Sequence, residues 1–242
     1  MTIKHVILPA SLLCLALSAG AQAEEAKKDL TWEASAELGF IKTSGNSETE
    51  TLNAKFNSET SYNLWTHKVL LEALKSASDA VRSAEKYRIE AQSDYSLSDA
   101  SYVFGLANWE NDNFSGLNYQ AAAVIGYGYK ALDSETMELS FEAAPGYRIT
   151  EDENGNDEED AIIRLAEIFS WNISKTSSLD QSLKVESGDS NTETRFGIGL
   201  TNQINGSLSM KVGYNIKHNS DVAPGADKTD RETAITLVYK LK

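Results

Sequence analysis

The segment TSGNSETETLNAKFNSETSYNLW, residues Thr43 to Trp65, alternates between apolar and polar side chains over most of its length. Successive side chains of a β-strand point to opposite faces, so this alternation predicts a strand with one apolar and one polar face. The apolar face carries Leu52, Ala54, Phe56 and Tyr62, and the polar face carries Asn53, Lys55, Asn57 and Glu59. A strand of a globular protein usually has about 5 to 6 residues, and this pattern runs much further. Such length is typical of a transmembrane β-barrel, in which one face of each strand meets lipid and the other meets water.

The same period of two recurs along the rest of the chain, and no helical apolar period persists. Clear strands are predicted at 31–41, 84–97, 117–130, 137–148, 193–200, 208–217 and 235–241, and weaker ones at 66–75, 100–110, 160–171 and 178–187. The predicted fold class is therefore all-β, a transmembrane antiparallel β-barrel of about 12 strands.

An even number of strands in a closed barrel leaves both chain ends on one side, the periplasmic side of a bacterial outer-membrane barrel. Short connections are then predicted on that side near 63–64, 98–99, 131–135, 172–177 and 203–207, and longer outer loops at 76–82, 151–159 and 219–229. Barrels also place aromatic side chains at both membrane interfaces. The candidates are Tyr62, Trp65, Tyr95, Tyr102, Tyr129, Trp171 and Tyr239 at the periplasmic ends and Phe40, Phe114, Tyr119 and Tyr147 at the outer ends.

A soluble β-sandwich is the alternative fold, although its strands are usually shorter and have no reason to end in aromatic residues. Two segments fit the barrel pattern poorly. Glu167 falls on the apolar face of its strand, and the strand from Lys68 to Lys75 is apolar on both faces. A β-bulge that resets the register would account for either segment.

The N-terminus has the three parts of an export signal. Lys4 gives a positive start, VILPASLLCLALSA an apolar stretch, and AQA at 21–23 a small-residue cleavage site. We therefore expect a cleaved signal peptide over residues 1–23 and a single outer-membrane β-barrel domain over residues 24–242. The single cysteine, Cys14, lies within that signal, so we expect the mature chain to have neither a disulfide nor a cysteine-ligated metal.

The charge balance is strongly acidic, with 36 acidic and 22 basic residues and a formal net charge of -14. Nucleic-acid binding requires clustered lysine and arginine to neutralise phosphates, so no nucleic-acid partner is expected. Sorted by strand face, however, the charges on the water-facing side are nearly balanced, and much of the acidic excess lies between Glu151 and Asp160. If the barrel conducts, we expect small or no steady conductance with a mild cation preference that weakens as salt rises.

Several motifs resemble those of the salt-induced outer-membrane protein family, catalogued as domain of unknown function number 481. They are TSGNSET at 43–49, NDNFSGLNYQ at 111–120, IGYGY at 125–129 and APGYR at 144–148. The resemblance covers most of the mature chain and departs from the family at Ala144, where a glycine is expected. It implies an outer-membrane β-barrel and brings no substrate, catalytic residue or cofactor.

Few residues suggest a catalytic or metal-binding role. His67 lies on the apolar face with Val69 and Leu71, where a histidine could serve a lipid hydrolase with a serine nucleophile, or could simply sit at the membrane interface. The acidic run DENGNDEED places Asp152, Asn154 and Asn156 at the spacing of a calcium loop. Asp157 stands where that loop requires glycine, so these four are only weak candidates for divalent cations. No catalytic residue, cofactor or confident metal site is predicted.

The expected function is that of a bacterial outer-membrane barrel with a structural or stress-related role, or a narrow passive pore. The alternatives are an outer-membrane lipid-modifying enzyme and a soluble periplasmic β-protein that binds a ligand. The expected partners are outer-membrane lipids and lipopolysaccharide, the barrel assembly machinery during insertion, and divalent cations at the acidic outer loop.

Overall fold

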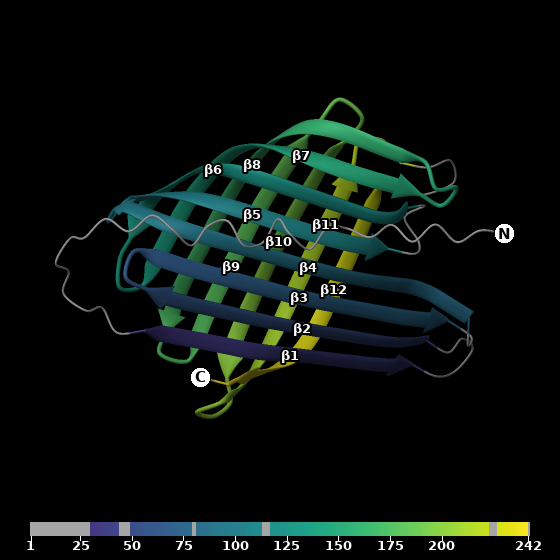
Figure 1. Cartoon of the computed structure of the whole chain (residues 1–242). Helices are drawn as coiled ribbons and strands as arrows, with labels where there is room; N and C mark the ends of the chain where they lie inside the picture. Colours follow the sequence, from purple (N-terminus) through teal and green to yellow (C-terminus); the bar gives the residue numbers. More distant parts are fainter. Residues whose placement is uncertain (1–29, 44–48, 79–80, 113–116, 223–226, 242) are drawn as a thin grey trace.

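The structure is a computed structural model and describes residues 30–43, 49–78, 81–112, 117–222 and 227–241. The expected signal peptide at 1–23 and the aromatic Phe114 lie outside these residues. Twelve antiparallel strands form one closed barrel, in which each strand pairs with its neighbours in sequence and β1 pairs with β12 (Figure 1). The strands are β1 (Thr31–Thr43), β2 (Thr49–Tyr62), β3 (Trp65–Ser78), β4 (Val81–Ser98), β5 (Ser101–Asp112), β6 (Leu117–Asp133), β7 (Met137–Asp152), β8 (Asp157–Ser174), β9 (Ser177–Ser187), β10 (Thr192–Gln203), β11 (Leu208–Asn219) and β12 (Thr229–Lys240). In the described residues no helix is long and apolar enough to span a membrane.

All the predicted strands are present, and several are longer than expected. The expected outer loop at 151–159 is mostly strand, because β7 runs to Asp152 and β8 starts at Asp157, with Glu151 paired to Asp157. The expected loop at 76–82 is shortened in the same way, since β3 ends at Ser78 and β4 begins at Val81. Cross-strand hydrogen bonding therefore continues into segments that polarity alone marks as loops.

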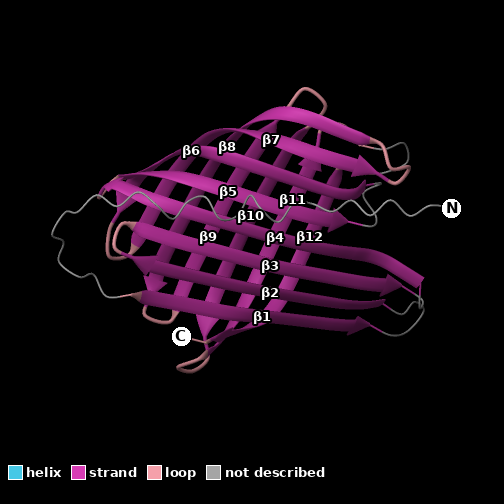
Figure 2. Ribbon diagram, viewed as in Figure 1, coloured by secondary structure: helices cyan, strands magenta, loops and turns pink. Residues whose placement is uncertain are grey.

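The start of β1 and the end of β12 lie at the same end of the barrel, as an even strand number requires (Figure 2). The connections at this end are tight. At the first of them Asn63 takes a left-handed conformation with φ of 54°, which a two-residue hairpin turn favours. The predicted placement of the short turns is confirmed.

The outer face of the wall is apolar, as the strand alternation predicted. The exposed side chains include Leu38, Phe40, Ile89, Ile125, Phe141, Leu165, Leu183, Val212, Ile235 and Leu237. A closed barrel satisfies all backbone hydrogen bonds within itself, which is what a sheet needs in order to cross a bilayer. Most of the predicted interface aromatics also face outward. Tyr102 was assigned wrongly, because its ring points into the barrel and is 7% exposed.

The register explains the two segments that fitted poorly. The pairing of β3 with β4 shifts register between Ser76 and Ala77, outside the segment Lys68–Lys75. The pairing of β8 with β9 shifts register between Asn172 and Ser174. The proposed bulges at Glu167 and within Lys68–Lys75 are therefore wrong. Glu167 stays on the lipid face, and β3 is apolar on both faces because some of its leucines point inward.

Glycines in the motifs IGYGY and APGYR allow close packing inside the barrel. A Cβ atom at Gly128 would lie 2.1 Å from Cζ of Tyr102, so the tyrosine ring occupies the space that a side chain would fill. A Cβ atom at Gly126 would lie 2.5 Å from Cβ of Ala144, and one at Gly146 would lie 2.3 Å from Cγ1 of Val124. These glycines let β6 and β7 approach the side chains beside them.

The seam between β1 and β12 is short. The two strands pair only from Ser35–Lys240 to Leu38–Leu237, whereas β1 pairs with β2 along its whole length. Just beyond the seam, a cavity of about 30 Å³ is lined by residues that include Gly39 and Glu232, enough space for a water molecule.

Candidate functional site: the charged lumen

The inward faces of the strands carry the chemistry of this protein. Inward residues recur at every second position of each strand, and many of them are charged. Arg148 and Arg164, each 1% exposed, are the largest fully buried side chains described. Charges in such an environment must be paired, because the loss of hydration costs several kcal/mol per ion.

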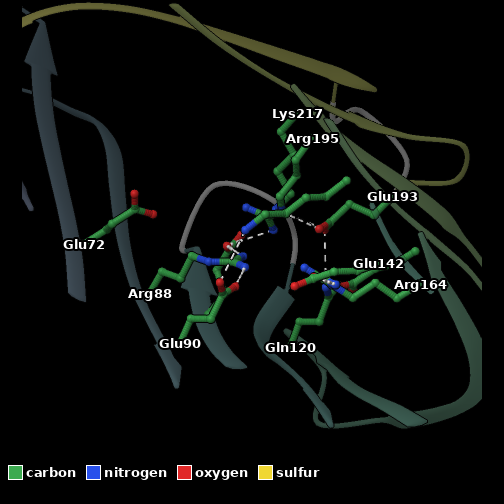
Figure 3. A network of polar contacts seen from close by, with 12 residues as sticks. Glu72, Arg88, Glu90, Gln120, Glu142, Arg164, Glu193, Arg195 and Lys217 are labelled. Atoms are coloured by element: carbon green, nitrogen blue, oxygen red, sulfur yellow. Dashed lines mark hydrogen bonds and ion pairs between the residues drawn. The ribbon is translucent and has the colours of Figure 1, made fainter. Parts of the chain in front are cut away.

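Glu110 on β5 is the centre of the largest cluster of charged side chains, and Figure 3 labels its partners Arg88, Arg195 and Lys217. Arg88 Nη1 donates to Glu110 Oε2 at 3.0 Å, and Lys217 Nζ donates to Oε1 at 2.5 Å. Arg195 Nη2 lies 2.9 Å from the same Oε2 atom. Lys86 Nζ is a fourth cation, 3.9 Å from Oε1, so a single buried carboxylate, 4% exposed, pairs with four cations.

The contacts of Glu110 cross the lumen. In the closed order of twelve strands, β5 and β11 lie diametrically opposite, and β10 lies next to β11. The pair Glu110–Lys217 therefore spans the full width of the barrel. Lys184 on β9 reaches Glu90 on β4 at 3.3 Å, and Gln120 on β6 donates to Glu193 on β10 at 3.3 Å. Side chains from opposite walls meet at this level, which lies toward the end away from the chain termini.

A second cluster surrounds Glu142 on β7. The carboxylate accepts hydrogen bonds from Arg164 Nη1 at 2.7 Å, from Gln92 Nε2 at 3.0 Å and from Tyr102 Oη at 2.9 Å. The Arg164 guanidinium lies 5.8 Å from the centroid of the Phe104 ring. Glu142 is therefore fully supplied with donors within a partly aromatic environment.

The interior has two unlike regions, which we call the packed half and the polar half, and β4, β9 and β10 lie between them in the ring of strands. The packed half consists of the inward faces of β5 to β8 and holds an apolar core: Tyr102, Phe104, Leu106, Ala122, Val124, Ala144 and Ile162. The polar half consists of the inward faces of β1 to β3, β11 and β12. There, the paired side chains of Lys55 and Glu72 keep 29% and 33% of their surface exposed. Water therefore reaches the polar half, whereas the packed half resembles the core of a soluble protein.

Near the outer end, Arg148 links three elements. Its Nη2 atom donates to Asp160 Oδ2 at 2.8 Å and to the backbone oxygen of Asn191 at 2.7 Å. Its Nη1 atom has no hydrogen-bond partner among the described residues. Arg148 belongs to the motif APGYR on β7, which lies with the motif IGYGY on β6 in the packed half.

The acidic candidates form a hydrogen-bonded turn. Asp152 Oδ1 accepts the backbone N–H groups of Asn154 and Asn156, at 2.8 and 2.9 Å, and Oδ2 accepts Nδ2 of Asn156 at 2.8 Å. The hydrogen bond from the Asn156 backbone lowers the pKa of Asp152 below its ordinary value. The carboxylate oxygens are thus turned toward amide donors, and Asp157 lies in β8. Across the described ranges, no group of three or more His, Cys, Asp or Glu residues could hold a metal ion.

The two histidines among the described residues lie far apart in the fold, on β3 and β11. His67 Nδ1 lies 2.9 Å from Ser93 Oγ on the lipid face, and its ring stacks on Trp65. His218 Nδ1 lies 2.8 Å from Thr229 Oγ1. A serine thus stands beside His67, and among the described residues no third side chain is hydrogen-bonded to this histidine.

Sequence reasoning missed Glu110, the hub of the lumen. The predicted strand at 100–110 alternates weakly, since its inward face is mostly apolar, with Tyr102, Phe104 and Leu106. The signal was nevertheless present, since Glu110 shares its parity with Asn108 and with Tyr102. Partners across the lumen could not be found in this way. Parity gives the face on which a side chain lies, but not the residue that it meets on the opposite wall.

Comparison with known proteins places this arrangement among membrane barrels. The family described as "Protein of unknown function, DUF481" matches residues 36–241. The "Uncharacterized protein YdiY" of Escherichia coli (strain K12) is 27% identical over 216 residues, which cover 87% of this chain and 83% of that protein. The NanC porin is similar in structure with a TM-score of 0.52 and 10% identity, over 85% of this chain and 98% of that one. The COG4313 outer membrane channel from Pseudomonas putida F1 has a TM-score of 0.54 and 11% identity, over 93% of this chain and 100% of that one. At these identities, the two solved structures share the fold.

Proposed function

The chain belongs to the DUF481 family of unknown function and is an outer-membrane β-barrel, and we propose that its own side chains close the lumen to all but water and small ions. The observation that carries this proposal is the contact of Glu110 with Lys217 and Arg195 across the barrel. A barrel of this size is intermediate between those filled by side chains and the wide porins. Ion pairs across its diameter reduce the remaining passage to the polar half.

The proposed role is therefore structural or stress-related, with at most a narrow and weakly selective passage. Cations and anions alternate along the polar half, as in the pairs Lys55–Glu72 at 3.0 Å and Lys211–Glu37 at 3.1 Å. Paired charges give little net field, so permeating ions meet no strong selectivity filter. Any cation preference comes from the acidic outer segments and is screened over about 8 Å at physiological salt.

Conductance of the refolded protein in a planar bilayer tests the proposal. The wild-type protein should show small or no steady currents. The charge-balanced double variant Glu110→Ala with Lys217→Ala should raise the conductance several-fold, because it removes the contact across the lumen.

The matched control is the double variant Lys130→Ala with Asp133→Ala. It also removes one cation and one anion, but from an exposed pair beside the β6–β7 turn with a 3.5 Å separation. This control should conduct like the wild type. Large, steady, strongly cation-selective channels in the wild type at molar salt would contradict the closed lumen.

A second candidate function, hydrolysis of membrane lipids, rests on the contact between His67 and Ser93. A serine with a neighbouring histidine can act as a nucleophile with its base. The position on the lipid face would bring both groups to acyl esters at the interface. Release of fatty acid from phospholipid vesicles by the wild-type protein, abolished in Ser93→Ala, would support this function. Equal release by the wild type and Ser93→Ala would reject it.

A further inference from the structure

A carboxylate lies within the lipid-facing belt of the barrel. Glu167 shares the outward parity of β8 with Ile163 and Leu165, each 53% exposed, on one side and with Phe169 and Trp171 on the other. A transmembrane strand needs about 9 to 11 residues, so Glu167 lies near the middle of the span that Trp171 ends. An ionisable side chain at this depth is costly unless a polar partner meets it.

One partner comes from the neighbouring strand. Gln181 Nε2 on β9 donates to Glu167 Oε2 at 2.9 Å. This bond uses one of the two amide N–H groups and one of the two carboxylate oxygens. The second N–H of Gln181 and Oε1 of Glu167 have no partner among the described residues.

The surroundings of the pair are apolar and exposed. Phe141 on β7 and Leu183 on β9 are the cross-strand neighbours of Glu167, and Ile198 on β10 is the neighbour of Gln181. These side chains are 47%, 38% and 36% exposed. The pair is thus a polar spot inside an apolar patch that covers β7 to β10, the strands that run side by side in Figure 1.

We propose that this patch is the interface of a two-fold dimer, in which the Glu167–Gln181 pair of one copy meets the same pair of a second copy. A two-fold axis brings identical surfaces together, so a self-complementary surface must offer a donor and an acceptor side by side. The free amide N–H and the free carboxylate oxygen meet this requirement. Each Gln181 donates to Glu167 of its own copy and to Glu167 of the other.

Packing supports the hydrogen bonds. Association of membrane segments depends on side-chain packing and on polar contacts, because lipid is as apolar as the protein surface. Phe141, Leu165 and Leu183 surround the polar spot and would pack against their symmetry mates. The partner is therefore a second copy of this chain, and not lipid alone.

Disulfide trapping in the outer membrane tests the dimer, since Cys14 is the single cysteine of the chain and lies in the expected signal peptide. Leu183→Cys should form a covalent dimer of twice the monomer mass on mild oxidation. The matched control Leu71→Cys, on β3 at 41% exposure, should remain monomeric because it faces lipid on another side of the barrel.

The hydrogen-bonded pair is tested in the same background. Adding Glu167→Leu and Gln181→Leu to Leu183→Cys should lower the trapped fraction about tenfold, since polar contacts between membrane segments stabilise their association. Heat-modifiable migration on a denaturing gel should show that this variant still folds, because leucine suits the lipid face.

Three outcomes would overturn the proposal. The Leu183→Cys protein could remain monomeric, it could be trapped with a partner of another mass, or its dimer could persist undiminished after both polar residues are replaced. The first two results would show that a second copy of this chain does not cover the patch. The third would show that the Glu167–Gln181 pair does not stabilise the dimer.

Discussion

The packed half and the polar half of the interior belong to one closed sheet, but their inward side chains differ in exposure to water. In the packed half, Phe104 and Ile162 are each 2% exposed and the arginines are enclosed. In the polar half, Lys68 keeps 41% of its side-chain surface although it pairs with Asp94 at 2.9 Å. Strand pairing is continuous around both halves, so the difference lies in the inward side chains alone. A barrel can therefore be built like a soluble core on one side and like a water-filled passage on the other.

Removal of a charge should give the largest difference between the two halves in the loss of unfolding free energy. Arg164→Ala leaves the buried Glu142 carboxylate without its cation, and we expect a loss of about 3–5 kcal/mol in the free energy of unfolding. Lys55→Ala breaks a pair that water already reaches, and its loss should be about 0–1 kcal/mol. Denaturant unfolding in detergent micelles measures both, and equal losses would abolish the distinction between the halves.

On the lipid side, the two halves should behave alike. Ile125→Arg on β6 and Val212→Arg on β11 each place a cation on the exposed outer face, where the residues are 75% and 43% exposed. Each should lower the stability of the inserted barrel by about 2–4 kcal/mol near the midplane. The yield of folded protein in the membrane provides the measurement. Normal yields from both variants would contradict the lipid-facing assignment.

A methyl group added at a glycine should give a smaller difference in stability between the two halves. Gly128→Ala forces the Tyr102 ring away and weakens its hydrogen bond to Glu142, at a cost of about 1–3 kcal/mol. Gly213→Ala on β11 meets its nearest atom, the backbone oxygen of Ile198, at an ordinary 3.9 Å. Its effect should be less than about 0.5 kcal/mol, typical of an unstrained site. Comparison of the two unfolding midpoints shows whether close packing is confined to β5–β8.

The smallest expected effect concerns permeation. Lys55→Gln removes a cation from the polar half, so the zero-current potential in a salt gradient should shift slightly toward cation preference. The shift should shrink as salt rises, because the Debye length falls to about 3 Å at 1 M. A shift that persists undiminished at molar salt would place Lys55 in a narrow filter instead.

The architecture was predictable because alternation is a local property. Leu52 and Phe56 on one face and Lys55 and Glu59 on the other define β2 without reference to any other strand. The same reasoning placed most interface aromatics correctly. It failed for Tyr102, since a strand with apolar side chains on both faces gives no local sign of which face is inward.

The site was much less predictable than the fold. The alternation of β10 and β11 is enough to put Arg195 and Lys217 on the inward face, but their meeting with Glu110 depends on strand number, tilt and the diameter of the barrel. Glu167 shows the opposite case. The sequence marked it as an exception, and the structure retains it on the lipid face because the register of β8 does not change there.

The seam between β1 and β12 joins the two ends of the sequence through four residue pairs and a backbone bond from Leu241 to Ala34. All other strand pairs join neighbours along the chain, whereas this one must bring together segments about as far apart as the chain allows. Contacts of such long separation carry the largest loop-closure entropy and form slowly. The ring should therefore close last during assembly and open first under stress, with the backbone amides at this seam exchanging their hydrogens before those of any other strand pair.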